Sequence, residues 1–164
     1  GKIIAVSYAL DNDPIHAVYG DDEHTLMIDL MTKIETIYNS TKDSIRRIAY
    51  NRRNFDLPYL WHKANLHLGN ASAKLIPANA SPYDTMRVFD PMKDIPNHRT
   101  YNGKPVLLSM DALAKGYNLP GKGDVSGADV LPLYLDGKLK LISEYCSDDV
   151  AKMRAITDRL GEQP

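Results

Sequence analysis

The chain has 164 residues, 43% of them hydrophobic and 25% charged, which is the composition of an ordinary globular protein with a buried core. This composition excludes the disordered, collagen-like and disulfide-stapled classes. Twenty basic and 21 acidic residues give a formal net charge of −1, so any bound polyanion must be held locally. No apolar run approaches the roughly 20 residues of a membrane helix, so no membrane contact is expected.

The N-terminal half carries strand and helix patterns in alternation. Short apolar, β-branched runs that end in turn-forming residues predict strands. Apolar residues at three- and four-residue spacing predict amphipathic helices, and Asp21 or Asp22 is a candidate N-cap for the first one. The predicted elements are strands at 3–10, 15–19 and 44–50, a helix through 26–38, and a helix at 56–68 that Gly69 ends.

The C-terminal half is predicted to be mainly helical. Its expected elements are a loop at 69–82, a short strand or helix start at 85–89, a loop at 91–105, a helix at 109–117 capped by Ser109, a helical piece at 129–135, and a long helix at 138–160. Strands followed by strands mixed with helices indicate one α/β domain over residues 1–164, with helices covering a sheet. The single Cys146 and the lack of a signal peptide favour the cytoplasm.

Asp56 is the first candidate site residue. It opens the predicted helix at 56–68, where a carboxylate can hold a water or an ion above the strand ends. The preceding Phe55 can present a flat face to a terminal base. An acid in the first turn is also an ordinary helix-stabilising residue, so position alone does not assign it a function.

Tyr145 and Asp149 form the second candidate group. They lie four residues apart in the predicted helix at 138–160, so they share one face and can converge on one site. A solvated helix face with a partly buried Tyr is the ordinary alternative. Asp148 is the rival acid, and Asp149 is preferred to it on the family spacing described next.

Two segments, YNRRNFDLPYL at 50–60 and the stretch from Gly116 to Val150, together resemble a known family of enzymes. They are similar to the second and third motifs of the predicted 3′–5′ exonucleases related to the proofreading domain of B-family DNA polymerases, which belong to the DEDDy group. The resemblance joins an aromatic-Asp pair and a Pro to a Leu-Pro-Gly-Lys turn and a Tyr-Cys-x-x-Asp-Val helix. It implies an RNase H-like fold, a mixed sheet flanked by helices.

The resemblance also implies the roles of individual residues. Asp56 and Asp149 would be catalytic metal ligands, and Tyr145 would orient the attacking water. The residues implied in substrate binding are Asn51, Arg53, Phe55 and Lys122. Hard oxygen ligands suit Mg²⁺ or Mn²⁺, and the complete family site holds two ions. The implied substrate is single-stranded DNA or another nucleic acid with a free 3′ end.

The family's first motif, an Asp-x-Glu on a central strand, is absent from the chain. Asp21-Asp22-Glu23 has the letters, but it follows the first hairpin and opens a helix, where capping explains it better. We therefore expect one more strand upstream, so that the domain is N-terminally incomplete. With two of the four family acids, the chain as given should bind Mg²⁺ weakly or not at all.

A catalytically inactive module that binds nucleic acid or protein is the alternative to the enzyme. The densest basic cluster flanks the second motif and would grip phosphates, although a solvated surface explains such pairs equally well; it comprises Arg46, Arg47, Arg52, Arg53 and Lys63. The five His residues show no metal-ligand spacing. Asp84 lies where relatives often carry an acid, and a turn role suits it equally.

Overall fold

The computed structural model describes residues 1–41, 47–48, 56–69, 88–94, 100–121, 123 and 125–161. The strands are β1 (Ala5–Tyr8), β2 (His16–Tyr19), β3 (Arg47–Ile48), β4 (Val88–Phe89), β5 (Thr100–Tyr101) and β6 (Lys104–Pro105). The helices are α1 (Glu23–Thr41), α2 (Asp56–Leu68), α4 (Pro91–Asp94), α5 (Met110–Gly116), α6 (Val130–Leu135) and α7 (Leu139–Arg159), with a 3₁₀ turn, η1 (Gly127–Asp129), before α6.

The strands pair two by two within the described ranges. β1 and β2 form an antiparallel hairpin in which Ala5 lies opposite Tyr19. β3 and β4 are parallel, with Ile48 opposite Phe89, and β5 and β6 are antiparallel. The described strands thus form three two-stranded sheets. The predicted mixed α/β class is confirmed, and the single RNase H-like sheet stays a prediction.

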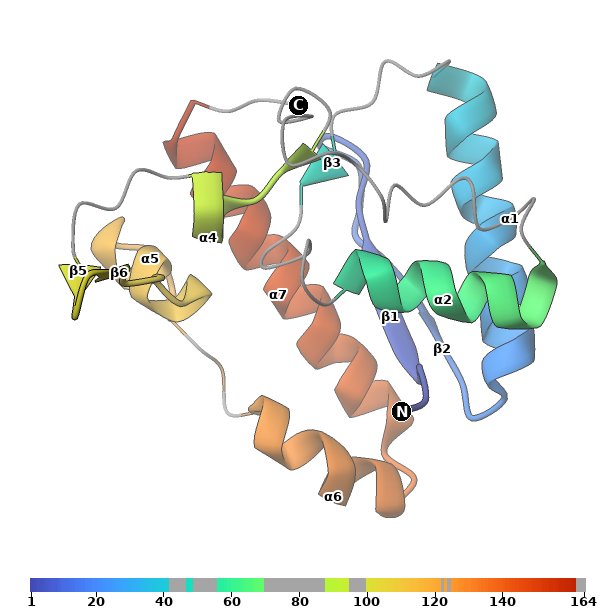
Figure 1. Cartoon of the computed structure of the whole chain (residues 1–164). Coiled ribbons are helices and arrows are strands. Elements are labelled where there is room, and N and C mark those ends of the chain that lie inside the picture. The colour runs from blue at the N-terminus through green and yellow to red at the C-terminus, as the bar shows by residue number, and fades with distance from the viewer. Residues whose placement is uncertain are drawn as a thin grey trace.

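Helix α7 organises the packing (Figure 1). It runs diagonally through the molecule and packs against β1, β2, α5 and α6. Helix α1 packs against α2 and β2, so the hairpin is enclosed by helices. The main hydrophobic core lies between the hairpin, α1 and α2 and consists of Ile3, Val18, Leu26, Met27, Leu30, Met31 and Ala64. A second core, of Leu113, Ala114 and Ile156, joins α5 to α7.

Helix α2 positions one candidate acid, and its bounds agree with the sequence prediction. Pro58 lies in its first turn, where the missing N–H costs no hydrogen bond. Gly69 ends the helix with φ +83°, and its N–H donates to the Asn65 carbonyl at 3.1 Å. Glycine adopts this left-handed conformation without the Cβ penalty, so the helix ends there.

The prediction of a loop at 91–105 is wrong, because the residues that the structure describes there form a short helix and two short strands. Pro91 begins the short helix α4, and the Asp90 carboxylate caps it by accepting from the Met92 N–H at 3.2 Å. Asn102 and Gly103, with φ +51° and +73°, form the tight turn between β5 and β6. Asn-Gly is the strongest short hairpin signal, so this turn and its two strands could have been predicted from the sequence.

Other predictions fall partly outside the described residues. Of the strand predicted at 44–50, the structure describes β3, and of the segment at 85–89 it describes β4. Asp84 and all but the first residue of the loop predicted at 69–82 lie outside the described ranges.

Ser109 caps α5 as predicted, because its side chain accepts from the Ala112 N–H at 3.1 Å. None of the helices that the structure describes has both the length and the apolar character needed to cross a membrane.

Candidate functional site

Two acids lie near the carboxyl ends of the parallel strands β3 and β4. Asp90 directly follows β4 and has no exposed surface, and Asp56 is the first residue of α2, the next described element after β3. Parallel strands end at the same edge of their sheet, which brings the following segments together. Loss of water around the Asp56 carboxyl raises its pKa, although the residue as a whole is exposed, and the charge of Asp90 raises it further.

Tyr145 and Asp149 are joined on the half-buried face of α7. The Tyr145 hydroxyl donates a hydrogen bond to the Asp149 carboxylate. Burial raises the pKa of Tyr145, and the charge of Asp149 raises it further, so this phenol stays protonated at neutral pH. Asp149 also lies 3.6 Å from the Lys152 ammonium, one helical turn further on. The spacing of these residues therefore gives the shared face that the sequence predicts.

Cys146 lies on α7, between Tyr145 and Asp149 in the chain. Burial raises the pKa of its thiol to about 11, and the charges of Asp149 and Asp56 add to this effect. Both carboxylates therefore act on the same sulfur, although one belongs to α2 and the other to α7. The two predicted acids thus influence the same thiol, and their membership of one site stays a prediction.

Asp148, the rival acid, faces elsewhere. A Cβ placed on Gly123 would lie 3.8 Å from the Asp148 Oδ2, so this carboxylate is directed at the loop before η1. The charge of its neighbour Asp149 acts on Tyr145 and Cys146 instead. Asp148 is thus directed at this loop, and the choice of Asp149 as the site acid stays a prediction.

Asp21 and Asp22 serve the N-terminal end of α1. Asp22 accepts from the His24 N–H at 3.1 Å and from the Thr25 hydroxyl at 2.5 Å, which is an N-cap arrangement. Asp21 accepts from Lys2 at 2.6 Å and from the Tyr134 hydroxyl at 2.7 Å, linking α1 to α6. The capping explanation is thus confirmed for Asp22, whereas Asp21 contacts Lys2 and Tyr134 instead.

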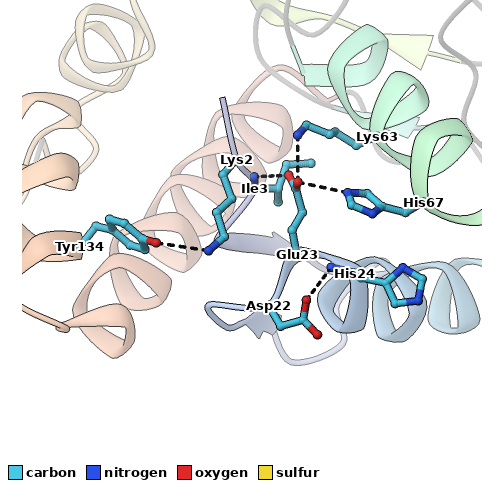
Figure 2. A network of polar contacts seen from close by, with 8 residues as sticks. All are labelled: Lys2, Ile3, Asp22, Glu23, His24, Lys63, His67 and Tyr134. Atoms are coloured by element: carbon cyan, nitrogen blue, oxygen red, sulfur yellow. Dashed lines mark hydrogen bonds and ion pairs between the residues drawn. The ribbon is translucent and has the colours of Figure 1, made fainter.

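Glu23 forms a separate buried contact (Figure 2). Its carboxylate accepts from the Ile3 N–H at 2.5 Å, from Lys63 at 2.8 Å and from the His67 ring at 3.1 Å. Its side chain is 12% exposed. Burial alone would raise its pKa, but these hydrogen bonds and the charge of Lys63 outweigh burial and lower the pKa to about 2. Both oxygens of the Glu23 carboxylate thus accept hydrogen bonds from protein groups, which gives this acid a structural role.

The described residues contain no group of three or more His, Cys, Asp or Glu side chains that could hold a metal ion. The predicted substrate-binding residues Asn51, Arg53, Phe55 and Lys122 lie outside the described ranges. Sequence reasoning missed Asp90, for which Asp-Pro at a helix start was the available signal. It also missed Cys146, whose burial no local pattern indicates.

One family model matches residues 2–154 of the chain. Its description is a predicted 3′–5′ exonuclease related to the exonuclease domain of PolB. The chain belongs to this family. No curated protein and no solved structure matches the chain.

Proposed function

We propose that this protein is a metal-dependent 3′–5′ exonuclease of the DEDDy type. It would hydrolyse phosphodiester bonds at the 3′ end of single-stranded nucleic acid, with DNA as the proposed substrate. The observation that supports the proposal is that the charges of Asp149 and Asp56, which belong to two different helices, both raise the pKa of the Cys146 thiol. Membership of the exonuclease family supports it independently.

The donors at this site are of the right chemical type for Mg²⁺ or Mn²⁺ but few in number. Asp56 and Asp149 would hold an ion through carboxylate oxygens, with water filling the remaining positions. A cation would also offset the repulsion that Asp90 exerts on Asp56. A bound divalent ion supplies an activated water and neutralises developing charge on the phosphate. The two acids of the family's first motif would complete the site, so we expect the chain as given to bind metal weakly or not at all.

The side chains of the chain itself handle orientation and protons. Tyr145, which is protonated and hydrogen-bonded to Asp149, would orient the attacking water through its hydroxyl oxygen. Asn51, Phe55, Arg53 and Lys122 would hold the terminal nucleotide, by stacking on its base and by contacting its phosphates.

The test is digestion of a 3′-labelled single strand with Mg²⁺ or Mn²⁺, using the chain of 164 residues and a form that carries an Asp-x-Glu strand before it. In an active form, Asp149→Ala should abolish digestion, because it removes a metal-facing carboxylate. Tyr145→Phe should slow digestion by about 10–1000-fold, the usual effect of losing one positioned proton-handling group. Binding of the strand should survive both changes.

Asp148→Ala is the matched control, because it removes the neighbouring carboxylate that faces Gly123. It should leave digestion near the unmodified rate. Unchanged digestion in Asp149→Ala, or an equal loss in Asp148→Ala, would remove the assignment of this site.

The alternative is an inactive exonuclease-like module that binds nucleic acid or protein. The finding that favours it is the lack, among the described side chains, of a group that could hold a metal ion. Strand binding without digestion in every form of the protein would establish the module and reject the enzyme.

A further inference from the structure

Three described elements meet at the Glu23 carboxylate, which we call the Glu23 clasp, made of Ile3, Glu23, Lys63 and His67 (Figure 2). Glu23 begins α1, Ile3 precedes β1, and Lys63 and His67 lie on successive turns of α2. The clasp therefore joins α2 to the start of the hairpin and to α1. The two side chains of α2 that contact Glu23 define which way this face of the helix is turned.

The same face of α2 carries Asp56. Lys63 and His67 follow Asp56 by seven and 11 positions. At about 100° per residue, both return to within about 20° of its direction around the helix axis. The apolar face, of Leu57, Leu60, Ala64 and Leu68, lies beside this polar edge and packs into the main core. Apolar packing holds α2 against the main core, whereas the hydrogen bonds of the Glu23 clasp fix the rotation of α2 about its own axis.

A further contact supports this orientation. A Cβ on Gly1 would lie 2.7 Å from the Tyr59 hydroxyl, so the first residue of the chain also packs against α2. The Lys63 ammonium lies 5.5 Å from the centre of the Tyr59 ring. The N-terminal segment thus contacts α2 directly at Tyr59.

We propose that Glu23 is a positioning residue for the candidate nuclease site: by fixing the rotation of α2, it directs Asp56 toward Asp149 and Cys146. This inference rests on the proposed function for its significance. It assigns to the third acid of the Asp-Asp-Glu run a role other than metal binding. Rotation of α2 about its axis would move the Asp56 carboxylate, because Asp56 lies on the same face of the helix as Lys63 and His67.

The reactivity of Cys146 reports where the Asp56 carboxylate points. Cys146 is the only cysteine of the chain, and the charge of Asp56 raises the pKa of its thiol. The experiment measures the rate at which iodoacetamide alkylates Cys146 at fixed pH below the thiol pKa. Asp56→Asn removes the charge and calibrates the reporter. A fall of half a unit in the thiol pKa would increase the alkylation rate about threefold.

Glu23→Gln should increase the rate in the same direction, since Asp56 turns away from the thiol. In the double variant with Asp56→Asn, Glu23→Gln should not increase the alkylation rate further, because the charge of Asp56 is already removed.

Asp21→Asn is the matched control: it removes the neighbouring acid, which contacts Lys2 and Tyr134 but not α2. It should leave the rate unchanged.

The double variant separates positioning from loosening of the buried thiol. If Glu23→Gln accelerates alkylation equally in both backgrounds, or in neither, the positioning role is rejected. Circular dichroism establishes that each variant is folded, and Lys63→Met replaces Glu23→Gln if the latter unfolds. The readout needs no nuclease activity, so a failed digestion assay leaves it interpretable. If Asp56→Asn itself has no effect, the site geometry is rejected together with this inference.

Discussion

At Glu23, burial and hydrogen bonding act in opposite directions on one carboxyl group. Burial favours the neutral acid, whereas the hydrogen-bond donors of Ile3, Lys63 and His67 favour the carboxylate. The effect of the donors is the larger one. The outcome is a folded-state pKa of about 2, below the ordinary value for an unfolded chain. Such a group stabilises the folded state above its unfolded pKa, and this contribution is lost as pH falls through the folded pKa.

We therefore expect Glu23→Gln to reduce the free energy of unfolding at pH 7. A lowering of the pKa to about 2 corresponds to a loss of the order of 3 kcal/mol. The difference between the unmodified protein and the variant should shrink as pH falls from about 5 to 2, because the Glu23 carboxylate becomes protonated. Urea unfolding at several pH values measures it. Two parallel curves across this range would contradict the lowered pKa.

Helix α5 depends on a side-chain cap at its first turn. The Ser109 side chain accepts the otherwise unpaired Ala112 N–H. Ser109→Ala should reduce the free energy of unfolding by about 1 kcal/mol, the usual effect of losing such a cap. Ser40→Ala in α1 is the control, because the Ser40 hydroxyl donates to the Ile37 carbonyl within the helix and caps nothing. Equal losses in thermal unfolding of both variants would exclude the capping role.

Local patterns predicted most elements because the information was local. Pro58 and Gly69 define the ends of α2, and the spacing of apolar residues defines α1. The hairpin at β5 and β6 was predictable from Asn102-Gly103 and was missed because the surrounding strands are two residues each. Asp90 was missed because one acid before a proline has many ordinary explanations.

The candidate site was predictable in part. The four-residue spacing of Tyr145 and Asp149 defines a shared helix face, so local periodicity sufficed there. The approach of Asp56 to α7 could not follow from local pattern, because it depends on how α2 packs against distant residues. Family resemblance supplied that link. The contact of Glu23 with Lys63 and His67 is equally long-range, and no motif indicated it.

The whole molecule depends on α7, which contacts both hydrophobic cores through different neighbours. Ile156 has no exposed surface and packs with Leu113 in the second core. The same helix packs against β1 and β2, which belong to the main core. Damage to the second core should therefore affect the main core through α7.

Ile156→Ala tests this coupling. It should reduce the free energy of unfolding by about 2–5 kcal/mol, because it removes buried methyl groups and leaves a cavity. Trp61, the only tryptophan, lies on α2 beside the main core, so its fluorescence reports on the part of the molecule distant from the substitution. If the two cores unfold as one cooperative unit, the Trp61 transition should shift by as much as the loss of helix measured by circular dichroism. Leu135→Ala, at a side chain that is 75% exposed, should shift neither transition appreciably. A Trp61 transition that stays in place while the helical signal shifts would mean that the two cores unfold separately.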